Sequence, residues 1–536
     1  MFSLVRHDLD RARAVLARQP EERLSQLLRD HGHDAFVPVV SEAPEPVIRL
    51  GTAETAAREA VPVRVSLADA EAHWTIAGTT GAGKTSFAAL LMSQMLSEGF
   101  GVGGADFKSG FWEDAIERAG AYAYRMPRLE QAAFVRRVHT LHPSSPDALQ
   151  PLNIAKVPAG IPAETACYET ARLFEELYPD SGFQMRNCLV YGLLLAAELT
   201  DVLGISFTLL EVIRILKDES FRTFCLSHTS QPAVLDFFGR FGAVPQSSKD
   251  ALLARLEALV LPQNIRLMFG ADDCLDFKRI LDAGLPLFMF LGKDASTAQD
   301  LVRLFANVVL LRLFQAAFAS GGSRPRPYSF FLDEPFHVLT PSLSEKFTLT
   351  LASLRSYNVF LVWILHHMSQ LDGRLRDALL NLTTILVTFR TEARVAQDLG
   401  DFLPDVDRET LREVLQHTSR APSRFELRAQ MRQRLAQLPD RVAYWYDKRK
   451  PYRAFRFRVA QVRAPHELAG CTRAEFEEFL EASGLRRGNA VPRETLRRQI
   501  AERERRLDQL MNPRIELMSS DSTLPPIERP RRSRVG

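Results

Sequence analysis

Residues 78–85 read GTTGAGKT and match G-x-x-x-x-G-K-[ST], the pattern of a phosphate-binding loop, at every fixed position. Glycines let the backbone wrap around a phosphate, while loop N–H groups and the N-terminus of a following helix attract its negative charge. The loop and the residue after it are therefore candidates for nucleotide binding: Gly78, Thr79, Thr80, Gly81, Ala82, Gly83, Lys84, Thr85 and Ser86.

Two side chains of this loop carry most of the expected chemistry. Lys84 would place a point charge on the outer phosphates, and the Thr85 hydroxyl is suited to holding Mg²⁺ that bridges phosphate oxygens. The motif lies between 73–78, a β-rich segment, and 86–92, a good helix, which is the setting that it requires. That setting disfavours the alternative of a chance glycine-rich turn.

Asp333 and Glu334 end an apolar strand that we expect at Tyr328–Asp333. A phosphate-loop enzyme needs one acid to hold Mg²⁺ and, if it hydrolyses the nucleotide itself, a base that orients water. Asp333 fits the first role and Glu334 the second, whereas a solvated acidic turn is the alternative. The adjacent carboxylates indicate an ATPase, and the chain lacks the N-K-x-D motif that reads guanine. We therefore expect ATP and Mg²⁺ as the cofactors.

The elements that must position these side chains come from a chain of 536 residues, of which 46% are hydrophobic and 25% charged. These values allow a large core and about three domains, and they exclude wholesale disorder. The five cysteines are widely spaced, so we expect neither a disulfide framework nor a zinc module. The net charge of +3 does not by itself indicate a nucleic-acid partner. No signal peptide or bilayer-spanning apolar run is found, so we expect a soluble chain.

A short strand is expected at Gly101–Asp106, and near-continuous apolar segments suited to strands buried on both faces lie at 285–291, Tyr328–Asp333, Val359–Leu365 and 384–389. Strand, helix and strand alternate around the phosphate loop, which is typical of a parallel sheet. From 164 to 268 only helical spacing is visible, including a capping box at Thr208 and Glu211. We therefore predict an α/β P-loop NTPase fold with a mainly parallel sheet, an inserted all-helical lobe and a small C-terminal extension.

The expected domain boundaries follow these changes in pattern. They are an N-terminal region at 1–60, a P-loop ATPase domain at 61–163 and 269–463, an inserted all-α domain at 164–268, a C-terminal helical extension at 464–517 and a disordered basic tail at 518–536. Late in the ATPase domain, alternation at 441–446 and 453–459 predicts a short antiparallel pair of strands.

The residues after Glu334 resemble the HerA–FtsK division of P-loop motors, and most of all the TraD/TraG-type coupling proteins of conjugation and type IV secretion. In that family an arginine precedes the strand after the acidic pair, and the strand ends in Q-S-x-S-Q-L. Here Arg355 precedes Val359–Leu365, which is followed by HHMSQLD. The segment DFKSG at 106–110 is similar to the family's D-x-K-G, and the helical insertion lies where coupling proteins carry an all-helical domain. The resemblance covers about 61–463 and implies a RecA-like fold.

The resemblance also implies roles for single residues. Arg355 would be a trans-acting finger whose guanidinium reaches the γ-phosphate in a neighbouring subunit, with a surface arginine at a helix end as the alternative. Arg390, at the end of the next strand, is a weaker candidate. The family's sensor glutamine falls on His366, which departs from the pattern. A neutral imidazole also donates one hydrogen bond, so either sensing survives in altered form or the coupling of hydrolysis to motion is impaired. The expected catalytic residues are Glu334, Arg355 and His366, and the expected metal ligands are Thr85 and Asp333.

By the same resemblance, the chain would be an ATP-driven motor that translocates DNA and hydrolyses ATP at the subunit interfaces of a ring, expected to be a hexamer. Many coupling proteins carry an N-terminal transmembrane anchor, and none is found here. We therefore expect a cytoplasmic protein, or one held peripherally at the inner membrane by secretion-channel or relaxase-type partners. DNA as a partner rests on the resemblance, because a solvated tail explains the terminal basic residues as well: Arg529, Arg531, Arg532 and Arg534.

Two alternatives remain open at this stage. A cytoplasmic HerA/FtsK-like translocase for DNA processing or defence is favoured by the missing anchor. An ATP-binding assembly or adaptor protein with weak turnover is favoured by the departure at His366. The sequence leaves the cargo, the strandedness of any DNA and the direction of travel undecided.

Overall fold

The computed structural model of the chain describes residues 46–54, 60–107, 110–178, 182–272, 275–291, 299–319, 324, 326–366, 368–392, 424–449 and 455–512. The basic tail expected from residue 518 lies outside these ranges, as does most of the N-terminal region expected at 1–60. Lys108 and Ser109 of the segment similar to D-x-K-G also lie outside them.

Within the described residues, eleven strands form one sheet in the order β2-β1-β12-β11-β10-β3-β9-β8-β4-β7-β5. The strands from β10 to β5 in this order run parallel to one another, which confirms the mainly parallel sheet predicted from the sequence. Their bounds are β3 Trp74–Ala77, β4 Gly101–Asp106, β5 His139–Leu141, β7 Leu287–Phe290, β8 Tyr328–Asp333, β9 Val359–Leu365 and β10 Ile385–Thr388.

The other end of the sheet is antiparallel. Strands β11 (Val442–Asp447) and β12 (Phe455–Val459) form the pair that their alternation predicts. Beyond them lie β1 (Val47–Glu54) and β2 (Ala60–Ser66). The sheet therefore includes a strand that lies before residue 61, the expected start of the ATPase domain. The reason is that β1 bonds to a strand on each side and buries Ile48 and Leu50, which only the folded sheet makes evident.

Helices cover both faces of the parallel strands. On one face lie α5 (Lys84–Ser97) and α6 (Phe111–Tyr124), and on the other lie α16 (Gln299–Phe318), α17 (Pro341–Leu354) and α18 (Gly373–Leu382). Strand β9 is apolar along its whole length because its alternate residues point into the cores on the two faces of the sheet. Shorter elements are α4 (Leu67–Ala70), α7 (Arg128–Val135), α21 (Arg424–Ala436), η2 (Pro335–His337), η3 (Arg355–Tyr357) and η4 (Met368–Gln370).

One helix of the described residues, over Leu301–Phe318, is long and apolar enough to cross a membrane. Inside this fold, however, 83% of that stretch is buried. Its apolar residues belong to the core between the sheet and the helical lobe, and Asn307 fixes it there by donating to Val338 O at 2.6 Å. We therefore interpret α16 as a core helix.

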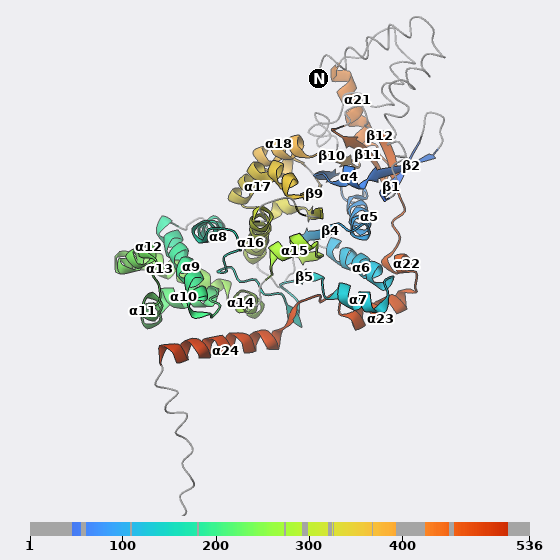
Figure 1. Cartoon of the computed structure of the whole chain (residues 1–536). Coiled ribbons are helices and arrows are strands. Elements are labelled where there is room, and N and C mark those ends of the chain that lie inside the picture. Colours follow the sequence, from blue (N-terminus) through green and yellow to red (C-terminus); the bar gives the residue numbers. More distant parts are fainter. Residues whose placement is uncertain are drawn as a thin grey trace, which may run out of the picture.

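A helical lobe stands beside the sheet (green in Figure 1). It is built from α8 (Ala163–Leu177), α9 (Phe183–Leu203), α10 (Leu209–Lys217), α11 (Glu219–Leu226), α12 (Pro232–Gly239), η1 (Phe241–Ala243), α13 (Gln246–Leu259) and α14 (Gln263–Gly270), and α15 (Phe277–Ala283) leads back to the sheet. Helix α10 begins with the capping box that the sequence predicts, since Glu211 Oε2 accepts from Thr208 N at 2.8 Å. The lobe and the sheet share one continuous core.

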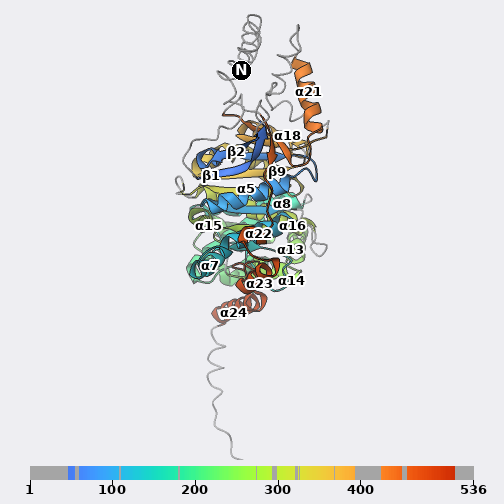
Figure 2. The ribbon, with the colours of Figure 1, turned by 90° about the vertical axis from the view of Figure 1, so that its right-hand side faces the viewer.

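The C-terminal segment runs from the sheet to the far side of this lobe (red in Figures 1 and 2). Helices α22 (Pro465–Ala469) and α23 (Arg473–Ser483) pack on α6, and β13 (Val491–Pro492) pairs antiparallel with β6 (Ala148–Leu149). Helix α24 (Arg493–Met511) then lies along the lobe and buries Leu496, Ile500 and Leu507. The last helix is therefore part of the fold rather than an appendage.

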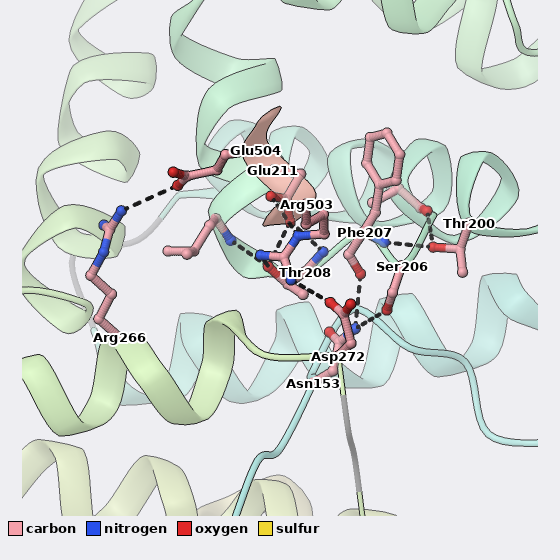
Figure 3. A network of polar contacts seen from close by, with 12 residues as sticks. Asn153, Thr200, Ser206, Phe207, Thr208, Glu211, Arg266, Asp272, Arg503 and Glu504 are labelled. Carbon is pink, nitrogen blue, oxygen red and sulfur yellow. Dashed lines mark hydrogen bonds and ion pairs between the residues drawn. The ribbon is translucent and has the colours of Figure 1, made fainter. Parts of the chain in front are cut away.

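A buried arginine holds α24 against the lobe (Figure 3). Arg503 is 2% exposed and donates from Nε to Glu211 Oε1 at 3.1 Å, and Glu211 is itself 3% exposed. Its other nitrogens contact Asp272 and, at 3.3 Å, Thr208 Oγ1. Because Glu211 also closes the capping box, one guanidinium joins α24 to the start of α10 and to the chain after α14.

We expect Arg503→Met to loosen α24. The substitution leaves the Glu211 carboxylate buried without its cation, and removing one partner of a buried ion pair costs about 3–5 kcal/mol. Hydrogen exchange at the α24 amides should show a fall of that order in the free energy of local opening. Arg505→Met is the matched control, because the Arg505–Glu502 pair is exposed and contributes about 0–1 kcal/mol. Equal protection in the two variants would contradict this role of Arg503.

Candidate functional site

The phosphate-binding pattern forms a glycine-dependent loop between β3 and α5. Three of its glycines have positive φ: 151° at Gly78, 78° at Gly81 and 111° at Gly83. A Cβ at Gly78 would lie 2.7 Å from Cβ of Phe389, so a side chain does not fit there. At Gly81 the same position meets nothing within 4 Å, so the loop is open on that side. Such an open loop ahead of a helix N-terminus suits a phosphate.

The loop is seated on the ends of the two strands that flank β3. Gly78 N donates to Leu365 O of β9 at 3.2 Å, and Thr79 donates to Arg390 O from N at 2.8 Å and from Oγ1 at 3.1 Å. Arg390 therefore supports the loop through its carbonyl group, and its guanidinium pairs with Asp440 at 2.8 Å. Nothing in this arrangement directs the Arg390 side chain to the loop.

Lys84, the first residue of α5, is buried below the loop, with 5% of its surface exposed. Its ammonium donates to Thr79 O at 2.8 Å and lies 3.0 Å from Nδ1 of His366. An ammonium group has donors only, so Nδ1 accepts this bond. Nδ1 also lies 3.3 Å from Gly78 O, and the other ring nitrogen, Nε2, faces Glu334 Oε1. The structure thus joins Lys84, His366 and Glu334 through two successive polar contacts.

Asp333 is the last residue of β8 and Glu334 follows it directly, and each is 5% exposed. Glu334 has φ 54°, a left-handed conformation that is uncommon for a residue with a side chain, and its N–H donates to Ile364 O at 3.0 Å. Such conformations cluster at functional sites. Asp333 lies opposite Asp106 of β4. Asp106 Oδ2 accepts hydrogen bonds from N–H groups at the start of α6, including Phe111 N at 3.0 Å. Of the two aspartates, Asp106 therefore has a capping role.

The donors fit a magnesium ion that is completed by phosphate oxygens. In the described part of the chain, no group of three or more His, Cys, Asp or Glu could hold a metal by itself. Thr85 supplies a hydroxyl on the exposed face of the loop and Asp333 supplies a carboxylate, and both are the oxygen ligands that Mg²⁺ prefers. Mg²⁺ is commonly bound through one or two carboxylates plus substrate phosphates. The assignment of Thr85 and Asp333 as metal ligands stays a prediction.

Arg355 lies at the opposite edge of the sheet. It is exposed in η3, between the end of α17 and the start of β9, whereas His366 follows the end of β9. Because β9 has seven residues, about 20 Å separates these edges along the strand. An arginine side chain is far shorter, so Arg355 does not reach the phosphate loop of its own chain.

A cavity of about 460 Å³ opens beside the loop. Its walls come from the loop and start of α5, from α6 and from the segment that leaves β12, with these lining residues: Gly83, Thr85, Ser86, Gly110, Asp114, Arg118, Arg441, Val459, Ala460, Val462, Arg463, Ala464 and Pro465. Its volume lies in the range of small-molecule sites. Arg118 is fixed in this wall, since it donates to Asp114 Oδ2 at 2.8 Å and to Arg463 O at 3.2 Å.

Comparison with protein families matches residues 48–102 to "Helicase HerA, central domain". This stretch runs from β1 through the phosphate loop into β4. Comparison with curated proteins gives no match. Among solved structures, the bacterial conjugative coupling protein TrwBdeltaN70 in its unbound form has a TM-score of 0.50 and 16% identity, covering 75% of this chain and 88% of that one.

This chain has the P-loop NTPase fold of that structure. Two further structures have TM-scores of 0.49. They are the plasmid coupling protein TrwB with ADP and Mg²⁺, at 16% identity over 79% of this chain and 97% of that one, and VirB4 of Thermoanaerobacter pseudethanolicus, at 13% identity over 78% and 97%. The recognition of a HerA-type P-loop domain from the sequence is confirmed, and so is the predicted fold class.

The loop, the acids and His366 were expected from the sequence, and the structure gathers them at one edge of the sheet. The wall of the cavity, including Arg441 and Arg463, was not predicted. Arg441 lies next to the loop because its N–H donates to Ala82 O at 3.0 Å, and it has φ 60°. No motif signals these residues, since they reach the loop only when β11 and β12 join the sheet.

We expect Ala464→Trp to weaken nucleotide binding, because the indole would fill much of the cavity beside Thr85 and Ser86. Loss of the space for a base and sugar should raise the Kd of a fluorescent ATP analogue by about 10-fold or more, equivalent to about 1.4 kcal/mol. Ala501→Trp, on the exposed side of α24, is the matched control and should leave the Kd unchanged. An unaltered Kd in Ala464→Trp would place the nucleotide elsewhere.

Proposed function

We propose that this protein is an ATP-driven, DNA-translocating motor of the kind found in conjugation and type IV secretion, with ATP hydrolysed between the subunits of a ring. One observation carries the proposal. Lys84, His366 and Glu334 meet beside the phosphate loop, whereas Arg355 lies at the opposite edge of the same sheet. If Arg355 acts on the γ-phosphate, it must therefore act on the nucleotide of a second copy of the chain.

The proposed roles follow from charge and position. Lys84 neutralises the outer phosphates, and Thr85 and Asp333 hold Mg²⁺, which offsets the charge of the phosphate oxygens. Glu334 orients water and accepts its proton, as a buried carboxylate at the rim of the loop is placed to do. His366 contacts both Lys84 and Glu334, so a γ-phosphate that takes over Lys84 would change the partners of His366. His366 would then report the nucleotide state.

The ring and its partners rest on the likeness to coupling proteins. DNA is the proposed cargo, and secretion-channel or relaxase-type proteins are the proposed partners. The proposed location is the cytoplasm, with peripheral attachment to the inner membrane through such partners. A hexamer is the proposed assembly, because it would bring each Arg355 to the phosphate loop of the next subunit.

Two other functions have specific support. The match of residues 48–102 to the central domain of the helicase HerA favours a DNA-processing or defence translocase. The contact of His366 with Glu334 favours an ATP-binding adaptor with weak turnover, because it engages the group that would orient water.

The deciding experiment is ATP turnover with single-stranded DNA, with double-stranded DNA and without DNA. We expect DNA to stimulate turnover, Lys84→Ala to abolish nucleotide binding and turnover, and Glu334→Gln to keep binding while turnover falls about 100-fold or more, the usual loss for a general base. Turnover that ignores DNA at all salt concentrations would contradict a translocase. Tight ATP binding without turnover in the unmodified protein would favour the adaptor.

Arg355→Ala should bind ATP normally and lose turnover by about 10³-fold, as removal of an arginine finger does. Mixed with Lys84→Ala, it should regain activity, because the Lys84→Ala subunits supply Arg355 to intact phosphate loops. Arg374→Ala is the control, since Arg374 is an exposed arginine of α18. Full turnover by Arg355→Ala alone would exclude the finger role.

A further inference from the structure

His73 is a buried residue that belongs to neither the phosphate loop nor the acids. It directly precedes β3, the strand that carries the phosphate loop, and only 2% of its surface is exposed. It therefore lies at the same edge of the sheet as Arg355, one strand length from the site described above. Burying an imidazole in an apolar core is costly unless its nitrogens are bonded.

Both ring nitrogens are bonded, and their partners lie on the two sides of Arg355. Nδ1 accepts from the N–H of Leu361 in β9 at 3.0 Å, which leaves the ring proton on Nε2. Nε2 then donates to the carbonyl of Leu351 in α17 at 2.9 Å. One side chain thus holds residue 351 before Arg355 and residue 361 after it.

The backbone of His73 is fixed to the sheet as well. Its carbonyl accepts from Thr384 N at 3.0 Å and from Ile385 N at 3.2 Å, at the start of β10. The ring also packs edge-on against Phe360, with centroids 6.1 Å apart. The side chain of His73 therefore projects from a rigid point of the sheet, five residues before the phosphate loop begins at Gly78.

The electrostatics agree with this bonding pattern. Burial is the main cause that lowers the pKa of His73 to about 4; the hydrogen bond to Leu351 opposes this shift and the positive charge of Arg355 adds to it. The imidazole is therefore neutral at physiological pH. Only the neutral ring can accept from Leu361 while it donates to Leu351, because imidazolium has donors on both nitrogens.

We propose that His73 is a positioning residue that ties the Arg355 segment to the strand carrying the subunit's own phosphate loop. Arg355 is exposed at the sheet edge, so its direction depends on how firmly residues 351 and 361 are held. This inference rests on the proposed role of Arg355 in a neighbouring site. It gives each subunit a direct link between the nucleotide that it binds and the arginine that it offers to the next subunit.

Two variants separate the polar contacts of His73 from its volume. His73→Leu fills similar space and loses both hydrogen bonds, whereas His73→Gln keeps an acceptor for Leu361 N and a donor for Leu351 O. We expect His73→Leu to bind ATP with a Kd within about twofold of the original and to lose turnover by about 100-fold, the effect of a misplaced catalytic group. His73→Gln should recover most of that loss, because it restores the bonds.

Mixing subunits locates the defect. If His73 acts on Arg355, His73→Leu regains turnover when it is mixed with Lys84→Ala, because the Lys84→Ala subunits supply a correctly positioned Arg355. Mixing with Arg355→Ala then restores no turnover. The reverse pattern, with rescue by Arg355→Ala and none by Lys84→Ala, would place the defect in the phosphate loop and overturn the inference. Turnover of His73→Leu equal to that of the unmodified protein would also overturn it.

Two controls distinguish a folding defect and a failure of the proposed function from a failure of the His73 inference. If His73→Leu does not fold, His73→Asn, whose shorter amide reaches at most one of the two partners, goes through the same mixing with the same criteria. Rescue between Lys84→Ala and Arg355→Ala is measured in parallel. If Lys84→Ala and Arg355→Ala do not rescue each other, the proposed function has failed. If they do, but His73→Leu is rescued by Arg355→Ala and not by Lys84→Ala, only the proposed role of His73 has failed.

Discussion

The direction of three adjacent parallel strands determines what the candidate site contains. In β3, β9 and β8 the register aligns Ala77 with Leu365 and Ile364 with Asp333. The phosphate loop, His366 and Glu334 therefore leave the sheet at one edge, as ligand-binding groups do in open α/β sheets. The same polarity places Arg355 and His73 at the other edge. Separation of the acids from the arginine is thus a consequence of strand direction, and it requires a second subunit if both act on one phosphate.

Burial of charge explains why the site is so closely bonded. Lys84 and Glu334 are both 5% exposed, and an isolated buried charge costs several kcal/mol. His366 lies between them and satisfies an ammonium on one side and a carboxylate on the other. The left-handed backbone of Glu334 stores additional strain. A phosphate that binds Lys84 would replace His366 as a partner of its ammonium group in this protected environment.

The C-terminal segment links the cavity beside the phosphate loop to the helical lobe along one stretch of chain. Residues 459, 460 and 462–465 line this cavity beside Thr85, and α22 and α23 then pack on α6. From there β13 joins β6, and Arg503 of α24 enters the lobe at Glu211. One continuous stretch of chain therefore contacts both the cavity and the lobe.

The sequence by itself determined the phosphate loop, the acidic pair, the parallel strands and the capped helices, because each depends on residues close together in the chain. GTTGAGKT needs only its own glycines and the helix that follows, and Thr208 and Glu211 are one helical turn apart. The tertiary structure alone decided that β1 joins the sheet, that His366 meets Lys84 and Glu334, and that Arg441 lines the cavity. It alone placed His73 between Leu351 and Leu361, 278 and 288 residues further along the chain. Contacts of that kind leave no local pattern, since strand order and packing, rather than spacing along the chain, bring the partners together.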